Sequence, residues 1–156
     1  MDVPSWILGL SLIVLTVAIH TTAVVLMALG LESTIRVRVD KHQPDVLRAI
    51  PTVIGHIGAV AVILAALHGL EGVLWASAYW RLGALESFTD ASVYSLATMS
   101  TFEIPGITLP SRFHMFSALE AVNGALLFGI STAFLFAVMQ AYWRVLSHRH
   151  DRWSDQ

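Results

Sequence analysis

Charged residues are absent from four stretches of the chain, and the lengths of these stretches predict its main elements. Three of them cover residues 3–31, 49–70 and 121–143, which gives 29, 22 and 23 residues. A helix of about 20 apolar residues crosses the hydrocarbon core of a bilayer, so each stretch is long enough to span a membrane. The fourth stretch, residues 91–102, has 12 residues, which allows about three helical turns but no full crossing.

The composition agrees with a membrane protein. Hydrophobic residues make up 56% of the 156 residues and charged residues 13%, whereas soluble domains have about 45–50% and about 25%. The net charge of −2 predicts no bulk attraction to nucleic acid. The sequence has no cysteine, which excludes disulfides, thiolate metal sites and cysteine nucleophiles. No basic residue precedes the first apolar stretch, unlike in a cleaved signal peptide, so we expect a retained helix.

Basic residues predict which side of the membrane each segment faces. Seven of the nine lysines and arginines fall in residues 32–48 and 144–152, which lie on the same side of a three-span protein. That side is then cytoplasmic, and the N-terminus lies outside the plasma membrane. We expect a cytoplasmic loop over residues 32–50, a cytoplasmic tail over residues 148–156, and a 91–102 stretch that enters from the outer face.

The segment from Asp90 to Pro110 reads D-A-S-V-Y-S-L-A-T-M-S-T-F-E-I-P-G-I-T-L-P. Ser87 or Thr89 can cap a short helix here, and Asp90 suits the positive end of that helix. The remainder, residues 100–110, holds two prolines and a glycine and is expected to be non-helical. Irregular backbone at membrane depth must line water or be buried in protein, because lipid offers no hydrogen bonds.

This order of elements resembles the pore unit of the potassium-channel superfamily, in which a short helix and a filter strand lie between an outer and an inner helix. The stretch A-S-V-Y-S-L-A-T-M-S-T is similar to the family's pore helix and its Thr-rich filter entrance. The stretch A-L-E-A-V-N-G-A-L-L-F-G-I-S-T-A-F-L-F is similar to the inner helices of small bacterial members. The resemblance covers about residues 52–145 and implies four copies around one axis.

The predicted fold is therefore an all-α membrane protein with three transmembrane helices, a re-entrant pore helix and a filter loop, assembled as a homotetramer in a lipid bilayer. The helix over residues 1–31 lies outside the implied pore domain, which covers residues 51–147. Within that domain the resemblance implies four elements: outer helix 51–79, pore helix 88–99, filter 100–106 and inner helix 113–147.

The filter departs from the family pattern T-V-G-Y-G. Glu103 and Pro105 replace its two glycines, and Pro105 cannot adopt the dihedral angles that glycine supplies. The stretch T-F-E is similar to the Thr-Leu-Glu filter of bacterial sodium channels. Four copies of Glu103 would form a carboxylate ring that selects cations. The residues expected to line the filter are Thr98, Ser100, Thr101, Phe102, Glu103, Ile104, Pro105 and Gly106.

Glu103 is thus the candidate metal-ion ligand, and the expected function is passive cation conduction. Ca²⁺ accepts oxygen ligands and offers the most charge compensation to the ring. Na⁺ and K⁺ are the other candidate permeant ions, and no further cofactor is expected. Two alternatives stay open: K⁺ selectivity despite the altered filter, and a Glu103 that is merely solvated in an outer vestibule.

Residues on the flanking helices are candidates for supporting this filter. Glu71 and His68 are three positions apart and could pair with each other, brace the pore helix or snorkel to the interface. Glu120 is expected to brace the filter, with pore lining as the alternative, because intramembrane carboxylates face protein or water.

Five residues of the third apolar stretch are candidates for cavity lining or gating. The polar ones can face the cavity or bond between helices, and the glycines can act as hinges or allow close packing. These residues are Asn123, Gly124, Gly129, Ser131 and Thr132.

Two other classes of protein compete with a channel. Four histidines within or near the membrane, His20, His56, His68 and His114, raise the possibility of a haem-binding membrane protein or a histidine metal site. A non-conducting membrane scaffold is the other rival. An enzyme is not expected, because the sequence has no G-x-S-x-G or H-E-x-x-H motif.

Overall fold

The structure is a computed structural model that describes the backbone of residues 3–41 and 46–154 and the side chains of residues 5–31 and 50–143. Helices account for 86% of the chain, and the described residues contain no strand. The prediction of an all-α fold is confirmed. The elements are α1 (Val3–Lys41), α2 (Val46–Arg81), α3 (Phe88–Met99), the 3₁₀ turn η1 (Ser111–Phe113) and α4 (His114–Ser154).

Three of the helices are long and apolar enough to cross a membrane. The candidate spans cover Ser5–Leu31, Ile50–Arg81 and Ser111–Trp143, which confirms the three spanning segments expected from the charge-free stretches. The short helix α3 lies between the second and the third span in the sequence and has 12 residues.

The helices extend beyond the apolar stretches at their polar ends. Within the expected loop over residues 32–50, α1 continues to Lys41 and α2 begins at Val46. Likewise α4 continues to Ser154, through most of the expected tail. Charged residues end a membrane span but not a helix, since lysine, arginine and glutamate are good helix formers in water. The side chains of residues 32–49 and 144–156, which carry the orientation prediction, lie outside the described residues.

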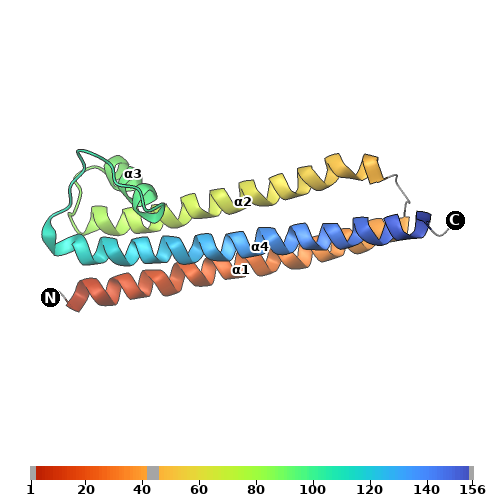
Figure 1. Cartoon of the computed structure of the whole chain (residues 1–156). Coiled ribbons are helices and arrows are strands. Elements are labelled where there is room, and N and C mark those ends of the chain that lie inside the picture. Colours follow the sequence, from red (N-terminus) through yellow and green to blue (C-terminus); the bar gives the residue numbers. More distant parts are fainter. Residues whose placement is uncertain (1–2, 42–45, 155–156) are drawn as a thin grey trace. The chain divides into compact units, whose positions relative to one another are not determined.

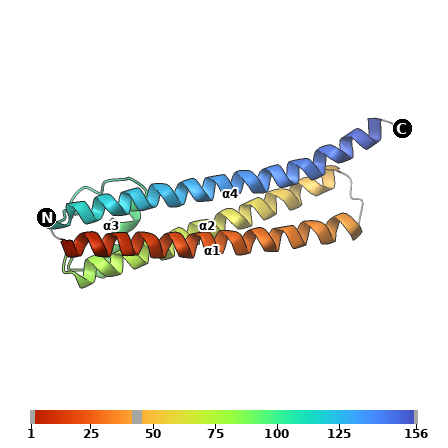
Figure 2. The same ribbon diagram turned by 90° about the horizontal axis from the view of Figure 1, so that it is seen from below.

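The chain forms two compact units, and each long helix contributes to both. Unit 1 comprises residues 1–21 and 65–130, and unit 2 comprises residues 22–64 and 131–156. In unit 1, parts of α1, α2 and α4 run side by side, and α3 lies at the end where α2 stops and α4 starts (Figures 1 and 2). The hydrophobic core of unit 1 centres on Trp75, Tyr79 and Phe116, whose rings pack at centroid distances of 5.0–5.1 Å.

One face of α1 packs into this core. Gly9, Thr16 and His20 are buried, and their spacing of seven and four residues places them on one stripe of a helix. A methyl group on Gly9 would come within 2.7 Å of the Leu119 side chain, so α1 and α4 approach closely there. This buried stripe is small or polar rather than aliphatic, as is common where membrane helices meet.

Unit 2 contains fewer buried side chains among the described residues. Leu64, Ser131 and Val138 are buried there, and the His56 ring stacks on Tyr142 at a centroid distance of 6.0 Å. The larger polar network of the described chain belongs to unit 1, and the candidate site is built there.

Candidate functional site

The short helix α3 begins at a conventional polar cap. Ser87 has an extended backbone, and its hydroxyl accepts hydrogen bonds from the amides of Thr89 and Asp90 at 3.2 and 3.4 Å. Asp90 lies in the first turn, where the helix dipole favours a carboxylate. Of the two caps expected from the sequence, Ser87 holds the position, and the helix starts one residue later.

The C-terminus of α3 ends in a Schellman motif with a threonine at the left-handed position. The amide of Phe102 donates to the Ala97 carbonyl at 2.8 Å, and the amide of Thr101 donates to the Thr98 carbonyl at 2.9 Å. This geometry requires a positive φ, and Thr101 has φ of +57°. Glycine usually fills this position, and a β-branched residue is strained there. Strained backbone of this kind concentrates at functional sites.

Residues 101–110 are non-helical, as expected for the predicted filter segment. Most of the filter candidates are exposed on the single chain, Phe102 to 65%, and Glu103, Pro105 and Gly106 are exposed as well. Ile104 and Thr98 are half-buried.

The end of α3 is pressed directly against α4 at a glycine. A Cβ atom on Gly124 would lie well under 3.0 Å from the Met99 carbonyl oxygen, a separation that real Cβ atoms do not show. On the other side, a Cβ on Gly72 of α2 would lie 3.0 Å from the Leu96 side chain. Gly72 and Gly124 therefore form the two small surfaces that admit α3 between α2 and α4.

A buried carboxylate, Glu120 of α4, binds α2 and α3 together. Its two oxygens accept hydrogen bonds from the Tyr79 hydroxyl at 2.6 Å and from the Ser95 hydroxyl. Ser95 also lies 2.8 Å from the Gly72 carbonyl oxygen. All of these side chains are buried. Glu120 thus meets a hydroxyl group from α2 and one from α3.

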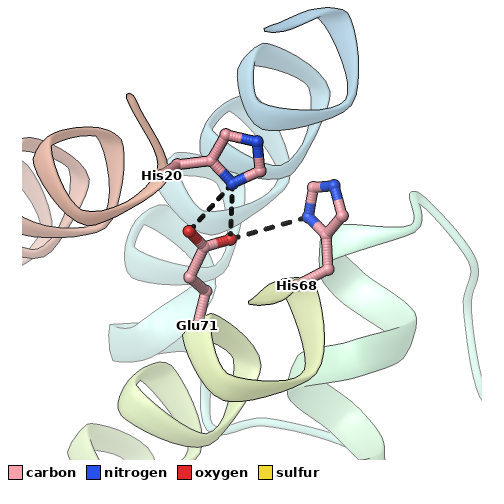
Figure 3. Close-up of side chains that lie close together, drawn as sticks. All are labelled: His20, His68 and Glu71. Carbon is pink, nitrogen blue, oxygen red and sulfur yellow. Dashed lines mark hydrogen bonds and ion pairs between the residues drawn. The ribbon is translucent and has the colours of Figure 1, made fainter. Parts of the chain in front are cut away.

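Glu71 of α2 lies at the centre of a second buried cluster, shown in Figure 3. The Nδ1 atom of His20, on α1, lies 3.0 and 3.3 Å from the two Glu71 carboxylate oxygens. The Nδ1 atom of His68 lies 3.6 Å from Glu71 Oε2. Glu71 and His20 are fully buried, and the His68 side chain is 13% exposed. The His68 ring stacks on Phe128 at 4.5 Å and meets the His20 ring at 5.0 Å.

Further polar contacts extend this network toward α4. Thr16 Oγ1 lies 3.1 Å from Asn123 Oδ1, and the Tyr94 and Ser117 hydroxyls lie 2.7 Å apart. Asn123 is fully buried, and its amide nitrogen has no hydrogen-bond partner among the described residues. Cavity lining and interhelical bonding were the two alternatives for Asn123. The contact with Thr16 is an interhelical bond, between α4 and α1.

The other candidates from the sequence lie away from these contacts. Gly129 is exposed, and a Cβ there would meet nothing within 4 Å. Thr132 is exposed, whereas Ser131 is buried in unit 2. His114 lies 3.2 Å from the Leu109 carbonyl oxygen, and His56 stacks on Tyr142, so neither joins the His20 cluster.

The sequence did not predict the contacts of four residues of the network: Thr16, His20 as a partner of Glu71, Tyr79 and Ser95. The pairs are far apart in the chain, by 51 positions for His20 and Glu71. The one available signal was the periodic small and polar stripe of Gly9, Thr16 and His20 in an otherwise aliphatic helix, which marks the packed face of a membrane helix.

Comparisons of the chain with protein-family models, curated proteins and solved structures find no match.

Proposed function

We propose that the protein is a pore-loop cation channel in which four copies surround an aqueous axis lined by residues 98–106, with Glu103 as the selecting residue. α3 is then a re-entrant helix that enters from the outer face and does not cross the bilayer. The observation that carries the proposal is the depth at which α3 ends relative to the two spans that flank it.

That depth follows from the glycine contacts. Met99, at the end of α3, lies against Gly124, which is 13 residues beyond the start of the span Ser111–Trp143 and about 20 Å along a helix. Gly72, which contacts Leu96, is nine residues before the end of the preceding span at Arg81, or about 14 Å. The two spans have 32 and 33 residues, or about 50 Å, and so extend beyond a hydrocarbon core of about 30 Å at both ends. With each span centred on the core, the irregular segment begins about 5–10 Å below its outer edge.

Irregular backbone at that depth is stable only beside protein or water. The exposed side chains of Phe102 and Glu103 would otherwise place a carboxylate and free peptide groups in lipid, at a cost of several kcal/mol for each unsatisfied group. Four copies facing one axis remove this cost, because neighbouring chains cover the segment on its sides and water covers it at the axis. The burial problem therefore favours an assembly around an aqueous axis, and the proposed number of four copies rests on the resemblance to potassium channels.

The polar network behind α3 supports the same function. A filter discriminates between ions only if its lining groups are held in place, and Glu120 and Gly124 hold α3 against both flanking helices. The α3 carbonyls of Leu96, Ala97 and Thr98 are already occupied by the Schellman bonds and the Ser100 amide. The ligands offered to an ion are then the Glu103 carboxylate and the hydroxyls and carbonyls that follow Met99.

The conduction mechanism is passive. A hydrated cation is attracted to the Glu103 ring, loses part of its water to carboxylate and carbonyl oxygens, and passes to the next set of oxygens. The absence of the two filter glycines argues against a continuous row of dehydrated K⁺ sites. We expect permeability to Ca²⁺ and Na⁺ besides K⁺.

Reversal potentials of the reconstituted full-length chain test this proposal. In planar bilayers with Ca²⁺ on one side and K⁺ on the other, Glu103→Gln is expected to lower the Ca²⁺-to-K⁺ permeability ratio at least about tenfold. Two unit charges in contact attract each other by ~1 kcal/mol even in bulk water, and a divalent ion loses twice as much as K⁺ when the carboxylate charge is removed. Glu86→Gln is the matched control, because Glu86 is also exposed and precedes α3. Equal K⁺ selectivity in wild type and Glu103→Gln would contradict the filter role, and no flux in wild type would favour a scaffold.

A further inference from the structure

We infer that His20, His68 and Glu71 bind a divalent transition-metal ion, with Zn²⁺ as the best-fitting ion, and that this ion clamps α1 to α2 within unit 1. The inference stands on the geometry of the cluster and does not depend on the proposed channel. It also concerns a site separate from Glu103, which is exposed on the loop after α3.

The three side chains converge on one point. His68 and Glu71 are three positions apart, so they share one face of α2, and His20 approaches that face from α1 (Figure 3). Ligand atoms from all three residues lie within 4.8 Å of one another. Among the described residues, no other group of three or more histidine or acidic side chains converges in this way.

The distances match the first coordination shell of zinc. Zinc–nitrogen and zinc–oxygen bonds are about 2.0–2.2 Å in tetrahedral sites, so two ligand atoms of one ion lie about 3.3 Å apart. The His20 Nδ1 atom lies 3.0 and 3.3 Å from the Glu71 oxygens, and His68 Nδ1 lies 3.6 Å from Oε2. All the ligand atoms lie within 4.8 Å of one another, so an ion can contact the three groups once they close by at most about 1.5 Å toward the spacing of a tetrahedral site.

The chemistry of the donors selects the class of ion. Two imidazole nitrogens and one carboxylate suit Zn²⁺ and its first-row neighbours, whereas Ca²⁺ and Mg²⁺ prefer oxygen ligands alone. The set His₂Glu with an open fourth position also occurs in zinc enzymes. The Phe128 ring stacks on His68 and helps to fix the direction of its Nδ1 atom.

Both histidines direct a ring nitrogen at the Glu71 carboxylate. The contact of His20 with Glu71 is an ordinary hydrogen bond at 3.0 Å, but the His68 Nδ1 to Glu71 distance of 3.6 Å exceeds the range of a hydrogen bond. Two imidazoles that aim the same ring nitrogen at one buried carboxylate (Figure 3) supply the nitrogen and oxygen donors of a zinc site. The carboxylate also neutralises half of the charge of a divalent ion in a buried place.

The position of the site links it to α3. Glu71 directly precedes Gly72, whose carbonyl oxygen lies 2.8 Å from the Ser95 hydroxyl. An ion on Glu71 would therefore fix α1 and the part of α2 that contacts the short helix. Binding free energy in such a site adds to the stability of the fold, because the ligands are brought together only in the folded chain.

Zinc binding to the full-length chain in detergent tests the inference. After chelator treatment, equilibrium dialysis against Zn²⁺ with metal quantified by mass spectrometry should give one high-affinity ion per chain. His68→Gln and Glu71→Gln should each weaken that binding at least about tenfold, since loss of even an outer-shell partner costs 10–100-fold. His56→Gln, in the same helix but outside the cluster, should bind as wild type does.

A second readout separates the cluster from the chain's other histidines. Co²⁺ in place of Zn²⁺ should give wild type and His56→Gln the intense visible absorption of a four-coordinate ion, and His68→Gln should lack it. Zn²⁺ should also raise the melting temperature of wild type but not of His68→Gln. His68 is the residue at the rim of the cluster, at 13% exposure, so its variant carries the test if Glu71→Gln does not fold. Equal binding and spectra in wild type and His68→Gln would overturn the inference.

Discussion

Gly124 of α4 lies directly against the carbonyl group of Met99, the last residue of α3. The contact joins a helix that is long and apolar enough to span a membrane to the end of a helix of 12 residues. It is a backbone-to-backbone approach, so no side-chain rotation can make room for a larger residue. It is also the contact from which the depth of the short helix is measured.

Gly124→Ala is therefore expected to displace the end of α3. The added methyl group would overlap the Met99 carbonyl, and overpacking of this kind costs about 1–3 kcal/mol. The melting temperature of the purified protein, followed by circular dichroism or tryptophan fluorescence, measures the loss. Gly129→Ala is the matched control in the same helix, because a Cβ there meets nothing within 4 Å and alanine is the better helix former by about 1 kcal/mol. Equal destabilisation by both variants would contradict the packing role of Gly124.

Glu120→Ala is expected to destabilise the fold more than Tyr79→Phe. The alanine variant leaves the buried Tyr79 hydroxyl without its acceptor and removes the bond from Ser95 to the carboxylate, while the Gly72 carbonyl oxygen still accepts from Ser95. One unsatisfied buried group costs about 1–3 kcal/mol, and the cavity left by the shortened side chain adds to this cost. The phenylalanine variant leaves one Glu120 oxygen without its donor, for a cost of about 1–3 kcal/mol, but it keeps the Ser95 bond and the ring volume. Glu86→Ala, an exposed carboxylate before α3, should leave the melting temperature unchanged. Thermal unfolding should give the lowest melting temperature for Glu120→Ala, a higher one for Tyr79→Phe and the highest for Glu86→Ala. A Glu120→Ala protein with the melting temperature of wild type would contradict the prediction.

The charge-free stretches of the sequence predicted the three spans, but they did not predict where the helices end. The three charge-free stretches correspond to the three candidate spans, because hydrocarbon thickness imposes a length and a composition on any crossing helix. The helix ends depend on hydrogen bonding and propensity outside the lipid, so α1 and α4 run on through charged residues to Lys41 and Ser154. The short helix could be predicted from the sequence, because its cap at Ser87 and the prolines after it are local signals.

Most contacts of the candidate site could not be predicted from the sequence, because they join residues far apart in the chain. His68 and Glu71 could be paired from their spacing on one helix, but nothing in the order of residues brings His20 to Glu71 across 51 positions. Tyr79 and Ser95 likewise meet Glu120 only after α3 has packed between two helices. The positive φ of Thr101 was hidden because glycine normally marks such a position, and here the nearest glycine is Gly106.

Thr101→Gly is expected to stabilise the protein by about 1 kcal/mol, because the left-handed conformation costs a residue with a Cβ roughly 1–2 kcal/mol and costs glycine little. Thr98→Gly is the contrasting variant. Thr98 lies inside α3, where glycine costs about 0.5–1 kcal/mol relative to alanine. Thermal unfolding should thus move in opposite directions for the two substitutions. A Thr101→Gly protein that melts below wild type would show that the threonine side chain contributes more than its backbone strain removes.

The orientation can be tested without removing any native residue, because the sequence has no cysteine. Single cysteines at Glu86 and at Arg36 are expected to lie on opposite sides of the membrane, the first outside and the second in the cytoplasm. A membrane-impermeant thiol reagent added to intact cells should label Glu86→Cys, and it should label Arg36→Cys only after permeabilisation. The reverse pattern would contradict the predicted orientation, and labelling of both in intact cells would contradict a three-span topology.

The same absence of cysteine makes the proposed tetramer testable by cross-linking. Phe102, on the segment after α3, and Val14, on α1, are both highly exposed on the single chain, at 65% and 69%. If four copies face one axis through the filter segment, cysteines at position 102 lie near one another, whereas cysteines at position 14 on the additional N-terminal helix lie away from that axis. Under mild oxidation in proteoliposomes, Phe102→Cys should give disulfide-linked dimers and Val14→Cys should not. Native mass spectrometry of wild type should give four chains; a monomer there, or cross-linking at position 14 alone, would contradict an assembly built around the filter segment.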